Sequence, residues 1–259
     1  MKDSECVPKI IFQTWKTHDV PQKWITSPQS IKLYMPLWKH VLFDDTENEE
    51  FVANHFPEYI LFFKSLRFPI QKADFIRYCF LYINGGVYSD LDIEFLSPID
   101  NLFVSQKGGD KVFLLKAPQN FAGHFTNFFM ASTAKNSFWL TVLRECVEPL
   151  APWVILPHNI ISEQTGLACL SRAVKKAKES TEIIVLPFKN LVPCDVCSSS
   201  ADSESKKPYY YTKFLKGQSW NGVDTHVFNS ILCNRIEIGF IAAFLAFIVL
   251  KNIFFLKLI

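Results

Sequence analysis

The feature that most constrains the fold is a helical pattern that stops at two glycines and is followed at once by an extended run. Apolar residues recur at helical spacing through IQKADFIRYCFLYI, residues 70–83, directly after Pro69. Gly85 and Gly86 end this pattern, because glycine is the usual residue where a helix stops. VYSDLDIEFL, residues 87–96, then has the composition of a β-strand. A helix that leads directly into a strand is typical of α/β proteins.

The rest of the chain continues the alternation of helices and strands, which predicts a largely parallel sheet. Residues 21–38 favour helix, with breaks at Pro28 and Pro36. Thr46 and Glu49 have the spacing of a capping box and predict the start of a helix. Strands are also expected at 7–15, 40–45, 111–116, 127–131 and 182–188, and helices at 136–148 and 162–178.

Length, composition and charge narrow the class of protein. The 259 residues suffice for one large domain with a proper core, and 49% of them are hydrophobic. The formal net charge of +2 argues against a nucleic acid as the partner. We expect one domain over residues 1–230, with a flexible loop at 194–208, where apolar residues are scarce.

An uncharged apolar run near the C-terminus predicts a membrane anchor over residues 236–258. GFIAAFLAFIVL, residues 239–250, contains no charged residue. Extended to Ile259, the segment reaches the roughly 20 residues that a spanning helix needs, with Lys251 or Lys257 able to reach the interface. A buried last helix is the alternative. MKDSECVPKI, residues 1–10, contains no apolar segment of the kind that signal peptides carry.

Three carboxylates follow one another within the expected strand at 87–96. In an extended chain Asp90, Asp92 and Glu94 share one face with Tyr88, at roughly 6–7 Å between successive positions. Carboxylates so placed repel one another unless a cation lies between them. Mg²⁺ and Mn²⁺ prefer oxygen ligands, and often combine one or two carboxylates with the oxygens of a bound diphosphate. A solvated acidic face of the sheet is the alternative.

The preceding helical segment adds a pair of opposite charges. Asp74 and Arg77 are spaced i, i+3, so they lie on one side of the helix. Their neighbours from Phe75 to Phe80 are largely apolar, which favours a buried pair able to hold sugar hydroxyls in a fixed geometry. A surface salt bridge worth less than ~1 kcal/mol is the alternative.

The run ADFIRYCFLYINGGVYSDLDIEFLSPID, residues 73–100, resembles the signature of glycosyltransferases with a DXD sugar-binding region. That family includes yeast-type α-mannosyltransferases and mannosyl-inositol-phosphoceramide synthases, and is distantly similar to clostridial glucosylating toxins. PKIIFQTWK, residues 8–16, resembles the first strand of the family, whose usual pattern has His where this chain has Phe12. The segments at 127–132, 164–166 and 217–220 fit more loosely. The resemblance implies a GT-A fold, a nucleotide-sugar donor, Mn²⁺ or Mg²⁺, and transfer with retention.

The resemblance also implies roles for individual residues. Asp90 and Asp92 would hold the metal, and Asn127 would lie near the reacting sugar. The residues expected to contact the donor are Phe12, Gln13, Trp15, Asp74, Arg77, Tyr88, Asp90, Ser219 and Trp220. The chain departs from the family where members often carry a histidine shortly before the Ser-Trp pair, because Tyr211–Phe214 stand there. Lys213 is a candidate to replace that histidine beside the leaving diphosphate.

The expected activity is transfer of a hexose to a lipid or glycan at a membrane. Mannose from GDP-mannose is the favoured donor, with UDP-hexoses open, and an inositol-phosphoceramide-like lipid is the favoured acceptor. Two alternatives remain: a phosphohydrolase with Asp90 as nucleophile, and an inactive protein that kept the fold. A lone C-terminal anchor predicts a cytosolic domain, whereas relatives commonly work in the Golgi lumen. The expected location is therefore a Golgi/ER-type membrane, with its side open.

Overall fold

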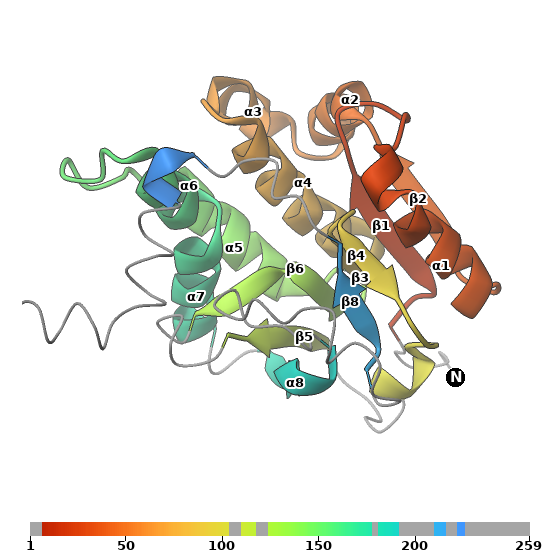
Figure 1. The fold of residues 1–259 in the computed structure, drawn as a ribbon. Helices are drawn as coiled ribbons and strands as arrows, with labels where there is room; N and C mark the ends of the chain where they lie inside the picture. The colour runs from red at the N-terminus through yellow and green to blue at the C-terminus, as the bar shows by residue number, and fades with distance from the viewer. Residues whose placement is uncertain are drawn as a thin grey trace, which may run out of the picture.

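A computed structural model of the chain describes residues 7–103, 110–117, 124–177, 181–191, 210–215 and 222–225 (Figure 1). A mixed six-stranded sheet, in the order β2-β1-β3-β6-β5-β7, forms its centre. The strands are β1 (Ile10–Thr14), β2 (Lys39–Phe43), β3 (Gly86–Ser89), β5 (Lys111–Lys116), β6 (Phe125–Ser132) and β7 (Glu182–Leu186). β6 runs antiparallel to both of its neighbours, β3 and β5, while the β1–β2, β1–β3 and β5–β7 pairs are parallel. The expected largely parallel sheet is therefore confirmed, with one reversed strand.

Helices cover both faces of this sheet (Figure 1). They are α1 (Thr26–Tyr34), α2 (Asp45–His55), α3 (Ile60–Ser65), α4 (Pro69–Asn84), α5 (Ser137–Val147), α6 (Pro157–Gln164), α7 (Leu167–Lys176) and α8 (Phe188–Leu191). Three 3-10 turns are η1 (Gln22–Trp24), η2 (Pro57–Tyr59) and η3 (Asp100–Leu102). A small second sheet pairs β4 (Ile93–Phe95) with β8 (Thr212–Phe214).

Two apolar cores lie on the two faces of the sheet, because successive strand residues point to opposite sides. Phe12, Tyr88 and Met130 pack with α4, α5 and α7 in one core. Ile11 and Val87, the neighbours of Phe12 and Tyr88 in the chain, pack with α1 and η3 in the other. The sheet is thus the middle layer of three.

The helix-to-strand junction has the geometry that the two glycines predict. Gly85 ends α4 at a φ of 64°, and Gly86 opens β3 at a φ of 87°. A Cβ on Gly85 would lie 2.5 Å from the backbone nitrogen of Ala134, and one on Gly86 would lie 2.6 Å from the carbonyl oxygen of Ile10. Glycine is required at both positions, since other residues would meet backbone atoms there.

The expectation of one strand over residues 87–96 is wrong. β3 ends at Ser89, and Asp90 makes the last backbone contact with β6, donating to the Phe128 carbonyl at 2.8 Å. Ile93 then donates to the carbonyl of Asp90 at 3.1 Å, which closes a turn before β4 leaves the main sheet. Asp90 and Asp92 therefore lie on a turn at the carboxyl end of β3.

Two helix predictions also need correction. The helix expected over 162–178 is divided into α6 and α7, because Thr165 and Gly166 both donate to the carbonyl of Ile161. Pro28 does not break a helix, since it lies in the first turn of α1, where no backbone donor is needed.

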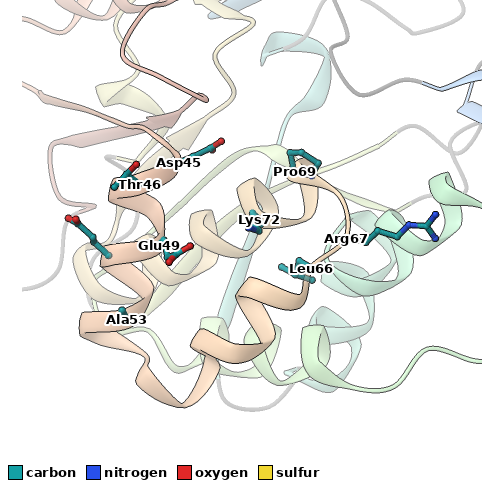
Figure 2. Close-up of a pocket in the computed structure, with 9 residues that line it drawn as sticks. Asp45, Thr46, Glu49, Ala53, Leu66, Arg67, Pro69 and Lys72 are labelled. Atoms are coloured by element: carbon teal, nitrogen blue, oxygen red, sulfur yellow. The ribbon is translucent and has the colours of Figure 1, made fainter.

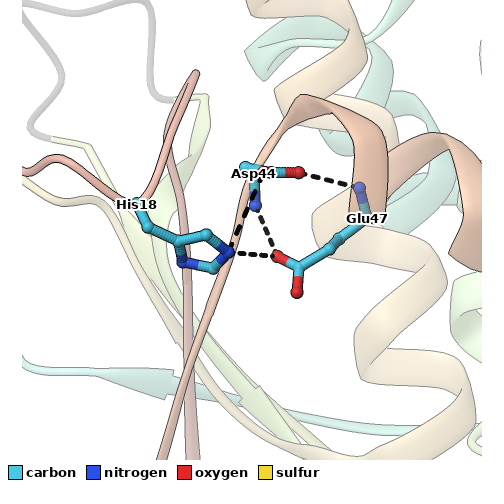
Figure 3. Close-up of side chains that lie close together, drawn as sticks. All are labelled: His18, Asp44 and Glu47. Atoms are coloured by element: carbon cyan, nitrogen blue, oxygen red, sulfur yellow. Dashed lines mark hydrogen bonds and ion pairs between the residues drawn. The ribbon is translucent and has the colours of Figure 1, made fainter.

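The capping box of α2 lies two residues earlier than the sequence suggests (Figure 3). The Asp44 carboxylate accepts from the backbone N–H groups of Thr46 and Glu47, each at 2.9 Å, and the Glu47 side chain accepts from the Asp44 N–H at 2.9 Å. His18 adds a contact at 3.0 Å from its Nε2 to Glu47. β2 ends at Phe43, so Asp44 is the first residue free to cap.

Among the residues that the structure describes, none of the helices combines the length and hydropathy needed to cross a bilayer. The expected anchor at 236–258 and the expected loop at 194–208 lie outside those residues.

The cap of α2 can be tested by two alanine substitutions. We expect Asp44→Ala to lower the free energy of unfolding by about 1 kcal/mol, because it removes the acceptor for two N–H groups. Thr46→Ala should leave stability unchanged or slightly higher, since alanine favours helix more than threonine. Urea denaturation of both variants shows whether Asp44 or Thr46 caps the helix. An equal loss from Thr46→Ala would contradict the structure.

Candidate active site

Several of the expected site residues converge at the edge of the sheet where β1 and β3 end. Asp90 and Asp92 come from the turn after β3, and Arg77 and Asp74 come from α4. Asn127 joins them from β6, the strand next to β3. Ligands of open α/β sheets bind outside the carboxyl ends of the strands, which is where this group lies.

Arg77 is the centre of the group and is only 2% exposed. Its Nη1 lies 3.2 Å from Asp90 Oδ1 and donates to the carbonyl of Asn127 at 2.7 Å. Its Nη2 lies 3.1 Å from Asp74 Oδ1. Its guanidinium also lies 4.3 Å from the centre of the Tyr88 ring. The alternative of a surface salt bridge is thereby excluded, because the pair is buried and holds three elements together.

Asp74 has several partners besides Arg77. The Asn127 amide donates to its Oδ1 at 2.9 Å, and the Thr165 hydroxyl donates to its Oδ2 at 3.1 Å. Burial raises the pKa of Asp74 to about 7, against the lowering effect of Arg77. The role of Thr165 was missed in the sequence, although the weakly similar segment at 164–166 contained it. The signal was too short to assign a role.

The Asp90–Asp92 turn carries the strongest indication of a bound cation. The Tyr88 hydroxyl donates to Asp90 Oδ1 at 2.5 Å, which together with Arg77 fixes that carboxylate. Asp92 Oδ1 is buried and has no hydrogen-bond partner among the described residues. Burial and the charge of Asp90 raise the pKa of Asp92 to about 7. A buried carboxylate oxygen without a donor is costly unless a cation compensates it, so these residues fit Mn²⁺ or Mg²⁺.

Gln13 ties the end of β1 to the same turn. Its Nε2 donates to the Ser27 hydroxyl at 2.9 Å and to the carbonyl of Asp90 at 3.3 Å. The Oε1 atom of Gln13 can only accept a hydrogen bond, and it lies 2.9 Å from Nε2 of His40. His40 therefore carries a proton on Nε2 and donates it to Gln13. Gln13 is fully buried, and it positions the turn.

The other expected donor contacts have different outcomes. Phe12 is fully buried and stacks on Phe80 at 4.1 Å between ring centres, so it offers no surface to a ligand. Trp15 is half-buried at the end of β1, with its ring edge-on to Trp24 at 4.8 Å. Ser219 and Trp220 lie outside the described residues. The expectation for Phe12 is wrong because its place on β1 points into the core.

Lys213 has a structural partner. It lies on β8 opposite Glu94 of β4, and its Nζ is 3.2 Å from Glu94 Oε1. The hydroxyl of Thr26 donates to the other oxygen of Glu94 at 2.6 Å. Glu94 is therefore held by two partners and does not join the Asp90–Asp92 pair.

A recess of about 550 Å³ lies between α2 and the start of α4 (Figure 2). Its charged lining includes Asp45 and Glu49 from α2, Lys72 from α4, and Arg67 from the preceding loop. α2 follows β2, and α4 begins at the same edge of the sheet, so the recess is on the side where β1 ends. The backbone N–H of Asp45 contacts the carbonyl of Lys16, the residue after Trp15, at 3.5 Å.

Replacement of Arg77 tests the buried network. We expect Arg77→Ala to lower the free energy of unfolding by about 3–5 kcal/mol, because two carboxylates would lose their buried counter-charge. Arg77→Lys should also destabilise, since an ammonium cannot reproduce the forked contacts. Arg67→Ala, at an exposed arginine, is the control. Chemical denaturation measures all three, and a small loss from Arg77→Ala would contradict the network.

His40 should make stability depend on pH. Burial, followed by the charge of Lys32, lowers the pKa of His40 from 6.5 to about 4. Below pH 6.5 the unfolded chain therefore binds a proton that the folded chain takes up only near pH 4. We expect this part of the stability to be complete above pH 6.5 and to be lost as the pH falls toward 4. The midpoint temperature of thermal unfolding should fall less steeply between pH 6.5 and 4 in His40→Gln than in the natural chain. An equal fall with pH in both proteins would contradict this prediction.

Residues 21–108 match the family described as glycosyltransferase sugar-binding region containing DXD motif. Inositol phosphoceramide mannosyltransferase 3 of Schizosaccharomyces pombe is 40% identical over 90 residues, covering 35% of this chain and 25% of the relative. Inositol phosphoceramide mannosyltransferase 2 of the same organism is 28% identical over 257 residues, covering 98% and 69%. Mannosyl phosphorylinositol ceramide synthase SUR1 of Saccharomyces cerevisiae is 33% identical, covering 67% and 43%. The matches thus span from a quarter to about two thirds of these relatives.

A solved structure shows the same fold at low sequence identity. The glycosyltransferase domain from the YGT toxin superimposes with a TM-score of 0.53 at 7% identity, covering 71% of this chain and 82% of that domain. This likeness agrees with the expected GT-A architecture. The DXD segment at 90–92 and the matched region around it lead to one conclusion: residues 21–108 are a glycosyltransferase sugar-binding region containing a DXD motif.

Proposed function

We propose that the chain is a retaining glycosyltransferase that moves a hexose from a nucleotide sugar to a membrane lipid. The favoured donor is GDP-mannose and the favoured acceptor is an inositol-phosphoceramide-type lipid. The printed names of the relatives support this choice, because they are inositol phosphoceramide mannosyltransferases and mannosyl phosphorylinositol ceramide synthases. UDP-hexoses remain the alternative donors.

The observation that carries the proposal is the buried, unpaired oxygen of Asp92 beside an Asp90 that Arg77 and Tyr88 hold in place. Asp92, with Asp90, would hold Mn²⁺ or Mg²⁺. When bound, such a cation supplies charge neutralisation for the leaving diphosphate. Arg77 fixes Asp90, and Gln13 fixes the backbone of the turn, so both carboxylates are preorganised.

The remaining residues would contact two different parts of the donor, the sugar and the nucleoside. Asp74, with Asn127 and Arg77 around it, would hold hydroxyls of the sugar. Trp15 would border the nucleoside, and the recess between α2 and α4 opens nearby, where the backbone of Asp45 contacts that of Lys16, the residue after Trp15. Ser219 and Trp220 remain predicted contacts of the diphosphate. Lys213 would have to leave its ion pair with Glu94 to assist there.

We infer retention by attack of the acceptor on the face from which the diphosphate leaves. Two carboxylates of the site, the buried Asp74 and the half-buried Asp90, are each held by Arg77, which lowers their availability as covalent nucleophiles. A sugar–protein adduct detected by mass spectrometry would overturn this part of the proposal.

We also propose that residues 236–258 anchor the enzyme in a Golgi/ER-type membrane. The apolar composition of that segment supports the anchor, and a lipid acceptor is consistent with it.

Donor hydrolysis without an acceptor tests the function. The full chain is offered GDP-mannose and a panel of UDP-hexoses with Mn²⁺, with and without EDTA. We expect metal-dependent turnover of one donor, and a loss of at least ~100-fold in Asp92→Asn, since the cation would lose a charged ligand.

Asp19→Asn, at an exposed carboxylate outside the site, is the matched control and should keep full turnover. Turnover that persists in EDTA and in Asp92→Asn would contradict the proposed metal site. Absence of both turnover and nucleotide-sugar binding would favour an inactive protein instead.

A further inference from the structure

An apolar surface projects from the molecule where α5 is joined to α6. We name it the α5–α6 surface and define it as Trp153, Ile155, Leu156 and Val223, which are 80%, 72%, 52% and 82% exposed. The segment from Pro149 to Pro157 contains no charged residue. Soluble proteins rarely expose several large apolar side chains together unless the surface has a partner. Figure 1 shows the connection between α5 and α6 extending outward beside the short helical segment at 223–225.

Hydrogen bonds hold the two parts of this surface together. The backbone N–H of His158 donates to Asp224 Oδ2 at 2.7 Å, and the ring of His158 contacts the Thr225 hydroxyl at 3.2 Å. Within the connection, Val154 donates to the carbonyl of Ala151 at 2.9 Å. The apolar side chains are therefore displayed on a defined backbone.

A second pocket opens next to this surface. Its volume is about 430 Å³, and it is lined by Phe68, Pro157, His158, Ile161 and residues 222–225. Ile161 lies one turn of α6 before Thr165, whose hydroxyl donates to Asp74. A helical turn rises about 5.4 Å, so the pocket lies between the α5–α6 surface and the proposed sugar site.

We propose that the α5–α6 surface docks on the lipid bilayer and that the neighbouring pocket receives the lipid acceptor from it. The role of the pocket rests on the proposed glycosyl transfer, and the docking rests on the composition of the surface and on the proposed anchor at 236–258. The surface carries a tryptophan among aliphatic residues without charge, which is the composition of side chains that sit at a membrane interface.

The length of the chain beyond Thr225 favours the bilayer as the occupant. The apolar segment proposed as an anchor begins at Ile236, and the intervening residues can span at most roughly 40 Å when extended. Because Asp224 and Thr225 are bonded to His158, an anchor inserted at Ile236 keeps the α5–α6 surface within that distance of the bilayer. The surface is then close enough to reach the bilayer.

Fluorescence quenching tests the docking without using activity. The full chain is reconstituted into phosphatidylcholine vesicles whose acyl chains are either plain or brominated. We expect brominated lipid to quench part of the tryptophan emission, and Trp153→Phe to remove a large share of that quenching. Equal quenching in the natural chain and in Trp153→Phe would overturn the docking. Another copy of the chain, or its own apolar segment, would then be what covers the surface.

Kinetics then test whether the surface delivers the lipid acceptor to the neighbouring pocket. In Trp153→Ser/Ile155→Ser/Leu156→Ser we expect the KM for a vesicle-borne acceptor to rise about 10-fold or more, because binding to the bilayer surface is lost. Donor hydrolysis and the KM for the donor should stay unchanged. The matched control is Leu33→Ser/Leu37→Ser/Leu61→Ser, three equally exposed leucines elsewhere, which should leave both KM values unchanged.

The outcomes distinguish docking of the surface on the bilayer from entry of the lipid through the pocket. A rise in the acceptor KM confined to the first triple variant supports the pocket as the entry for the lipid. Equal effects of the two triple variants, or no effect of either, would overturn it. Lipid quenching of Trp153 in a chain that hydrolyses no donor would leave the docking in place and reject the proposed function.

Discussion

The buried charge of Arg77 is the constraint on which the rest of the site depends. A guanidinium removed from water is stable only when anions and hydrogen-bond acceptors surround it. Asp74, Asp90 and the carbonyl of Asn127 supply these partners from α4, the turn after β3, and β6. One side chain therefore fixes α4 and the turn after β3 relative to β6, which lies about 40 residues further along the chain.

The backbone around this network makes the approach of these elements feasible. Gly85 and Gly86 let α4 pass into β3 against the backbone of Ala134 and Ile10, where no side chain would fit. The reversed strand β6 pairs with β3 and brings Asn127 beside α4. The turn at Asp90 then leaves the sheet and carries Asp92 to a position where one oxygen is buried without a donor. Fold and charge thus produce a site that fits a cation.

Two hollows open beside the start of α4. The recess on the α2 side is lined by charged residues of both signs, and the pocket on the α6 side adjoins the exposed apolar α5–α6 surface. The loop at 66–69 separates them, because Leu66, Arg67 and Pro69 line the recess and Phe68 lines the pocket. One short loop therefore contributes to two hollows of different character.

Local sequence patterns were enough to predict several helices and strands and the candidate site residues of this protein. The period of the apolar residues predicted α4, the glycines predicted its end, and the run at 73–100, through its resemblance, predicted the family and the candidate site residues. Only the tertiary structure decided that the acidic run is a turn, that Phe12 is core, and that Thr165 contacts Asp74. The physical reason is that helical period and glycine conformation are properties of neighbouring residues. Burial, strand termination and hydrogen bonding between distant segments depend on contacts that exist only once the chain has folded.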